Sequence, residues 1–214
     1  MVLVLTPLGW PLAAHPVMPP VLEVGTNFYF WGMEHLVGGF DHLAFLASLL
    51  LPGGRLGRLA KVTLGFTLSH SLTLGLVANG LIYVERWWLE PLIAASIVFV
   101  ALDAAKNHDK LRPRFDHRFE WALGFGLVHG MGFASALEEL GVAPGTLLTA
   151  LLGFNLGLET VQILVILTAL PLLFWLAKQP ERKRNLLVRW SGYGIAACGT
   201  WWCLERFYHY NWLV

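Results

Sequence analysis

The stretch TLLTALLGFNLGLETVQILVILTALPLLFWLA, residues 146–177, decides the fold class. It carries one charged residue, Glu159, and it exceeds the roughly 20 apolar residues that a helix needs to cross the hydrocarbon core of a membrane. A run this continuous is also far longer than a strand of a membrane barrel. The stretch therefore predicts a membrane-spanning helix that tilts, or bends near Pro171.

The composition of the whole chain points the same way. Hydrophobic residues make up 56% of the 214 residues and charged residues only 14%, whereas a soluble domain carries about 25% charged residues. The formal net charge of +1 gives no general attraction to nucleic acid. Two cysteines cannot build a disulfide scaffold. The composition indicates an integral membrane protein in contact with lipid, and it excludes disordered, fibrous and nucleic-acid-binding chains.

Five further stretches have the length and apolar character of membrane spans. Together they predict an all-α protein with six transmembrane helices, over residues 28–51, 60–83, 88–105, 119–138, 146–177 and 186–206. We expect residues 28–214 to form this six-helix domain and residues 1–27 to form an outward-facing arm. A shortened signal peptide is the alternative for the first 20 residues.

The basic residues set the predicted orientation. Thirteen of the fifteen Lys and Arg residues fall in the loops between spans one and two, three and four, or five and six, or within the first four residues of the span that follows. By the positive-inside rule these loops face the cytoplasm, so both termini face outward. We expect a multi-pass protein of the bacterial inner membrane.

Ionisable residues inside the spans mark the candidate functional site, because a charge in the bilayer is costly. Four helices each place one such residue in the middle third of the membrane: His42, His70, His129 and Glu159. Asp41 adjoins His42, and His35 shares its helix face about two turns nearer the outer surface. Imidazole and carboxylate are ligands of zinc, nickel and cobalt. A single histidine would suggest a helix contact, but the matched depth favours a shared metal or proton site.

Other polar residues accompany these candidates. Five of them are expected to fix histidine tautomers and hold the ligands in place: Thr67, Ser69, Ser71, Asn155 and Gln162. Asp103 lies near the inner end of span three, where it could assist the exit of an ion.

The two halves of the chain show a faint self-similarity. His42 and Ser48 match His129 and Ser135 at an offset of 87, and the Gly-Phe-Thr-Leu run at 65–68 matches Gly-Phe-Asn-Leu at 153–156. Three spans per half would give the halves opposite orientations. The similarity therefore raises the hypothesis of a 3+3 inverted repeat with a site at the membrane midplane.

Several motifs are specific in combination: His35 with Asp41-His42, FTLSHSLTL at 66–74, LIAASIVFVA at 92–101, FGLVHGMGFA at 125–134 and FNLGLE at 154–159. They resemble the HupE/UreJ family, membrane proteins associated with hydrogenase and urease systems, and in particular its second branch. The resemblance covers about residues 28 to 170. It implies a metal permease.

The leading hypothesis is a carrier for a divalent transition metal ion, with nickel or cobalt first and zinc as a further candidate. His35 would receive the ion from outside, and a midplane site would hold it: Asp41, His42, His70, His129 and Glu159. One alternative is an intramembrane zinc-type hydrolase, in which Ser69 or Asp41 orients the attacking water. Another is a non-transporting partner in metalloenzyme assembly. The sequence leaves open whether the chain forms a homo-oligomer or binds a maturation partner.

Overall fold

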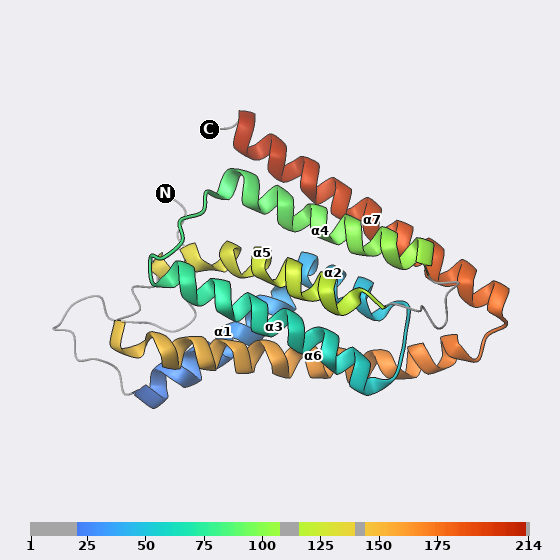
Figure 1. Ribbon diagram of the computed structural model, residues 1–214, viewed down its shortest axis with the longest axis horizontal. Helices are drawn as coiled ribbons and strands as arrows, with labels where there is room; N and C mark the ends of the chain where they lie inside the picture. Colours follow the sequence, from blue (N-terminus) through green and yellow to red (C-terminus); the bar gives the residue numbers. More distant parts are fainter. Residues whose placement is uncertain (1–20, 108–115, 140–143, 213–214) are drawn as a thin grey trace.

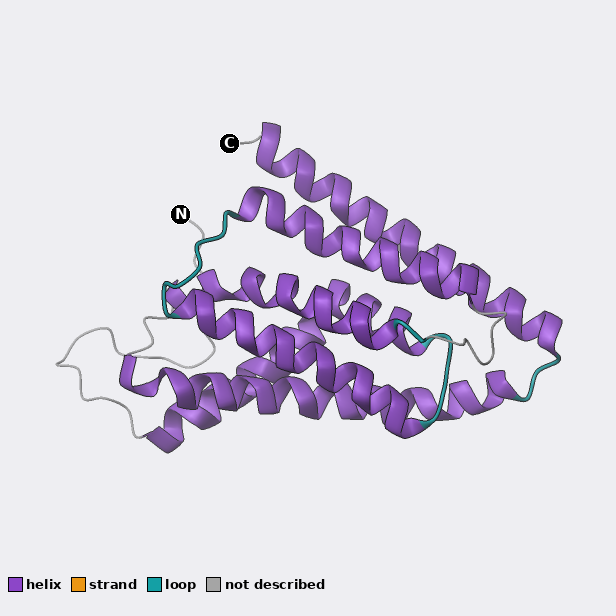
Figure 2. Ribbon diagram, viewed as in Figure 1, coloured by secondary structure: helices purple, strands orange, loops and turns teal. Residues whose placement is uncertain are grey.

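The computed structural model describes residues 21–107, 116–139 and 144–212, and within these ranges all regular structure is helical (Figures 1 and 2). The elements are α1 (Val21–Gly38), α2 (Phe40–Leu50), α3 (Leu56–Ala78), α4 (Arg86–Asn107), α5 (Arg118–Glu139), the 3-10 turn η1 (Pro144–Thr146), α6 (Leu147–Ala177) and α7 (Glu181–Trp212). The expected all-α fold is confirmed. α1 begins seven residues before the predicted start at 28, and residues 1–20 of the predicted arm lie outside the described residues.

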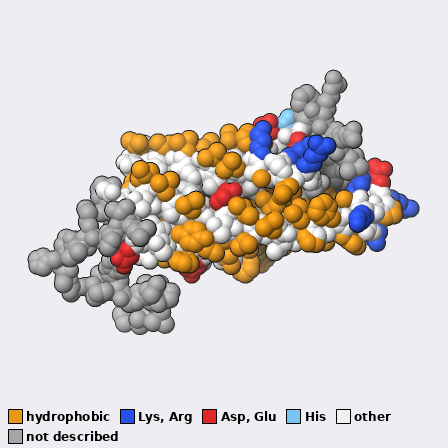
Figure 3. Space-filling view, turned by 90° about the horizontal axis from the view of Figure 1, so that it is seen from below, with side chains coloured by type: hydrophobic (Ala, Val, Ile, Leu, Met, Phe, Trp, Pro, Cys, Tyr) orange, Lys and Arg blue, Asp and Glu red, His pale blue; other side chains and the backbone are white. Residues whose placement is uncertain are grey.

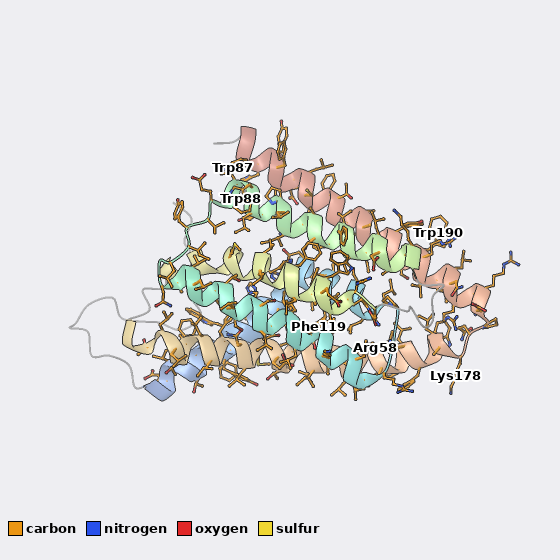
Figure 4. The ribbon with its side chains drawn as sticks, in the orientation of Figure 1. Arg58, Trp87, Trp88, Phe119, Lys178 and Trp190 are labelled. Carbon is orange, nitrogen blue, oxygen red and sulfur yellow. The ribbon has the colours of Figure 1, made fainter. Side chains whose placement is uncertain are left out.

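The helices run lengthwise along an elongated bundle (Figure 1). The start of α1, the end of α7 and the α3–α4 connection lie at one end, and the connections at 51–55 and 178–180 lie at the other. Figure 3 shows basic side chains gathered toward that second end, beyond a largely hydrophobic surface. In Figure 4 the Trp87 and Trp88 side chains lie near the first end and Arg58 and Lys178 toward the second.

Among the described residues, two helices are long and apolar enough to cross a membrane on length and composition alone: α6 and the segment Trp87–Lys106 of α4. Only 22% of the apolar window of α6 is buried inside the protein. An exposed apolar surface of this extent is unusual for a protein in water and suits contact with lipid. The remaining long helices carry more polar and charged residues, which lower their hydropathy.

The most extensive helix contacts pair α3 with α5, α4 with α7, and α1 with α6. Small residues allow two of these pairs to approach closely: Gly126 and Gly130 of α5 lie against backbone carbonyls of α3, and Gly153 and Gly157 of α6 lie against those of α1. A Cβ atom at any of these four positions would overlap the neighbouring helix. At Gly38, in contrast, an added Cβ atom would have nothing within 4 Å.

The first predicted span is two helices, and the prediction of one continuous helix over 28–51 is wrong. Gly39 separates α1 from α2 with φ −86° and ψ 86°, a ψ value outside the helical region. A Cβ atom on Gly39 would stand 2.8 Å from the carbonyl oxygen of His35 and 2.8 Å from Nδ1 of His42. Glycine is therefore required for the chain to turn so tightly here.

Arg118 holds the carboxyl end of the short helix α2. Its side chain is nearly buried, and Nη1 donates to the carbonyl oxygens of Leu49 at 3.0 Å and Gly53 at 2.9 Å. The last carbonyls of a helix lack partners within the helix, so this contact caps α2. Hydrogen bonds from Arg118 also hold the pKa of Asp116 below its usual range.

Candidate metal-binding site

Four histidines from four helices meet inside the bundle: His35 of α1, His42 of α2, His70 of α3 and His129 of α5. Ring centroids are 4.6 Å apart between His35 and His42, and 5.2 Å apart between His42 and His129. The rings of His35 and His70 are 6.5 Å apart. His70 and His129 are each 1% exposed. These four residues are called the histidine cluster below.

His35 belongs to this cluster and does not form a separate outer position. One continuous helix would set His35 and His42 about 10 Å apart along its axis. The break at Gly39 turns the chain between them, and the two rings meet edge to face at 4.6 Å. The predicted separation is wrong because it assumes a helix that the glycine interrupts.

Asp41 orients His42. Its Oδ1 accepts from the backbone N–H of His42 at 2.9 Å and lies 2.9 Å from Nδ1 of the same ring. A carboxylate can only accept hydrogen bonds, so Nδ1 carries the proton and the lone pair of His42 is on Nε2. The other oxygen, Oδ2, accepts from Nη2 of Arg206 on α7 at 2.8 Å. Asp41 was expected to be a direct metal ligand, but both of its oxygens are engaged.

Ser96 of α4 orients the ring of His129. Its hydroxyl donates to the carbonyl oxygen of Ile93 at 2.6 Å, so it accepts from Nε2 of His129, which lies 2.9 Å away. The lone pair of His129 is then on Nδ1, a buried atom with no hydrogen-bond partner in the protein. Sequence reasoning missed Ser96 and Arg206 as members of the site.

His70 has neither ring nitrogen in a hydrogen bond, and both are buried. A buried polar atom without a partner costs about 1–3 kcal/mol. With Nδ1 of His129, the rings of His70 and His129 therefore hold three buried nitrogen atoms without a hydrogen-bond partner in the protein. Such atoms are available to a ligand that could complete their bonding.

Aromatic rings surround the cluster and make it apolar. Phe45 lies 4.9 Å and Phe66 lies 5.3 Å from the ring of His129, and Phe154 stacks on His70 at 6.2 Å. These residues were not among the sequence candidates. The Gly-Phe pair that recurs at 65–66 and 153–154 was the signal that could have found two of them.

A second polar group joins α3 to α6. The hydroxyl oxygen of Thr67 lies 3.1 Å from Oε2 of Glu159 and 3.1 Å from Oε1 of Gln162. These three residues are called the oxygen cluster below. A small hollow is lined by one member of each cluster, His42 and Gln162, and by Thr63, with apolar side chains around them. Glu159 was expected to be a ligand beside the histidines, but its hydrogen bond is to Thr67.

The remaining sequence candidates bond within their own helices. Ser69 donates to the carbonyl oxygens of Gly65 and Phe66, and Ser71 to that of Thr67. The Nδ2 group of Asn155 likewise donates to the carbonyl oxygen of Leu151. Helical serines commonly bond back in this way. Their predicted role in fixing tautomers belongs instead to Asp41 and Ser96.

Asp103 lies far from the histidine cluster along α4. It is seven residues beyond Ser96, or about 10 Å along the helix. The structure therefore places Asp103 apart from the residues it brings together.

The histidine cluster is an open row and not a closed cage. Within the described ranges, no three His, Cys, Asp or Glu side chains are arranged to hold a metal ion. The donor chemistry still fits nickel, cobalt or zinc, because neutral imidazole nitrogen is a preferred ligand of these ions and a poor one for magnesium or calcium.

Comparison with known proteins gives one family. Residues 19–206 match the family described as HupE / UreJ protein, which covers nearly the whole chain. No curated protein and no solved structure matches the chain significantly.

Proposed function

The chain belongs to the HupE/UreJ family, and from this premise we propose that it carries a divalent transition metal ion across a membrane, with nickel or cobalt first. The family is membrane-associated and is linked to nickel or cobalt uptake or to metalloenzyme maturation. The observation that carries the proposal is the histidine cluster, in which His70 and His129 hold three buried ring nitrogens without hydrogen-bond partners. The metal ion is the substrate, and zinc is a further candidate.

In this proposal α1 with α2 forms the first membrane span and the five helices α3 to α7 form the others, with both termini outward. The grouping of basic side chains toward one end of the bundle supports this orientation (Figure 3). A span that is broken beside a polar site is also a known feature of transporters. Here that break lies at Gly39, between two histidines of the cluster.

The helix pairing supports the inverted repeat. In a 3+3 repeat, α1 with α2 corresponds to α5, and α3 corresponds to α6. The pair formed by α1 and α6 then corresponds to the pair formed by α5 and α3, and both are among the most extensive pairs. The repeat also relates α4 to α7, so the third extensive pair, formed by these two helices, is related to itself.

The ion would bind first at the histidine cluster. Nε2 of His42 and Nδ1 of His129 carry lone pairs whose directions are set by Asp41 and Ser96, respectively. His70 could bind the ion through either of its ring nitrogens. From the hollow lined by His42 and Gln162, the ion would then pass to the oxygen cluster, which contains the carboxylate of Glu159. Moderately strong, exchangeable ligands are what a carrier needs, because a closed tetrahedral cage would retain the ion.

Uptake of radiolabelled nickel and cobalt into proteoliposomes tests the proposal. We expect uptake above that of protein-free liposomes, abolished in His42→Ala and in His70→Ala. His117→Ala is the matched control, since His117 is an exposed histidine outside the cluster, and it should retain uptake. Wild-type uptake no faster than in protein-free liposomes, or full uptake by the His42 and His70 variants, would overturn the proposal. Metal retained stoichiometrically without uptake would favour an enzyme.

A further inference from the structure

Arg206 neutralises the carboxylate that touches the histidine cluster. Nη2 of Arg206 donates to Oδ2 of Asp41 at 2.8 Å, and Nη1 donates to the carbonyl oxygen of Glu90 at 3.3 Å. The contact crosses from α7 to the first turn of α2, over a sequence separation of 165 residues. The side chains of Arg206 and Asp41 are 25% and 14% exposed.

The charges balance only while no ion is bound. Asp41 contributes one negative charge and Arg206 one positive charge, and neutral imidazoles contribute none. A divalent ion on Nε2 of His42 would set three positive charges against one carboxylate. Interactions between charges are strong where water is scarce, so this imbalance opposes binding.

Arg206 can relieve the imbalance only by moving. A guanidinium group does not lose its proton in proteins. Its side chain is long and a quarter exposed, so the charged head can swing away from Asp41 while the stem stays on α7. Asp41 would then be free to offset the charge of the ion held by the neighbouring ring.

We propose that Arg206 is a tethered counter-cation, which pairs with Asp41 when no ion is bound and is displaced by the incoming divalent ion. Its return to Asp41 promotes release of the ion. Arg206 is thus a positioning residue that tunes affinity and does not itself bind the metal. The proposal rests on the proposed carrier function.

The direction in which metal affinity changes when Arg206 is replaced separates this role from a structural one. If Arg206 only anchors Asp41 and α2, its loss disorders His42 and weakens metal binding. If Arg206 competes with the ion for the Asp41 carboxylate, its loss leaves that carboxylate free to offset the charge of the bound ion. Binding is then tighter and release slower, and a bound ion stabilises the variant more than it stabilises the wild type.

The test is titration with Co²⁺ of the full chain in lipid nanodiscs, with release into excess chelator followed by stopped flow. For Arg206→Ala and Arg206→Gln we expect the Kd to fall about tenfold and release to slow in proportion. Arg206→Lys keeps the charge and should lie within about threefold of the wild type. Arg182→Ala, an exposed basic residue at the other end of α7, is the control.

The outcomes distinguish the two proposals. Wild-type protein that binds Co²⁺, with equal or weaker binding in the folded Ala and Gln variants, overturns the counter-cation role and leaves the carrier intact. Wild-type protein that binds no Co²⁺ overturns both. If the Ala variant does not fold, the Gln variant decides, because it keeps a polar amide donor on a shorter side chain while it removes the charge.

Discussion

The histidine cluster and the oxygen cluster share one helix but differ in how their polar atoms are satisfied. Thr67 and His70 lie about one turn apart on α3, and both are nearly buried. The hydroxyl of Thr67 contacts both Glu159 and Gln162, whereas neither nitrogen of His70 has a hydrogen-bond partner. Polar groups that bond one another hold helices together, and those left without partners are available to a ligand.

The two clusters also differ in what orients them. The oxygen cluster orders itself through contacts among its own members. The imidazoles are set by partners on other residues, Asp41 for His42 and Ser96 for His129. In the proposed carrier, binding would therefore depend on the histidines and their partners, and movement of the ion would depend on Glu159.

The largest expected effect is from His70→Ala. It removes a ring whose two nitrogens are both unpartnered, and Co²⁺ affinity should fall by at least about 100-fold, since even changes behind the ligands cost about 10–100-fold. Calorimetric titration of detergent-purified protein measures this. Affinity that stays at the wild-type level, in protein that elutes as a single folded species, would show that the unpartnered ring has no part in binding.

Gly39→Ala should have the next largest effect. The added methyl group would press on the ring of His42 and the carbonyl oxygen of His35, so the rings would separate and Co²⁺ affinity would fall about tenfold or more. Gly38→Ala is the control, because its Cβ atom meets nothing within 4 Å. Equal affinities for the two variants would mean that the tight turn at Gly39 does not determine the spacing of the histidine rings.

Ser96→Ala should weaken binding by about tenfold, the lower bound for loss of a residue that orients a ligand. The hydroxyl accepts from Nε2 of His129, and without it the ring can change tautomer. Ser69→Ala is the comparison, because that hydroxyl bonds only to carbonyls of its own helix, and it should stay within about threefold of wild type. The reverse ranking of the two serines would restore the role predicted for Ser69.

Glu159→Gln should change Co²⁺ affinity least, by no more than about threefold, because the side chain keeps a group that can bond Thr67. Uptake into proteoliposomes should nevertheless fall several-fold, because the substitution removes the negative charge of the oxygen cluster. Co²⁺ binding and uptake measured on one preparation of Glu159→Gln would show whether uptake falls while affinity is nearly unchanged. A loss of affinity as large as that of His70→Ala would indicate that Glu159 binds the metal together with the histidines, in the single site expected from the sequence.

Much of the site was predictable because polar residues in apolar helices are few. His42, His70 and His129 stand out in this way, and the structure brings them together with His35. The break at Gly39 was not predictable, because glycines are common in membrane helices and most do not interrupt them. Ser96 and Arg206 look ordinary in the sequence and acquire a role only from neighbours far along the chain.

The sequence by itself determined the helical class, the family and the residue types of the site, because hydropathy and residue identity are local properties. Only the tertiary structure decided which nitrogen of each ring carries a lone pair, that Asp41 is paired with Arg206, and that Glu159 bonds Thr67. These features depend on hydrogen bonds between helices. Such bonds are fixed by how the helices pack, and periodicity along one helix does not encode them.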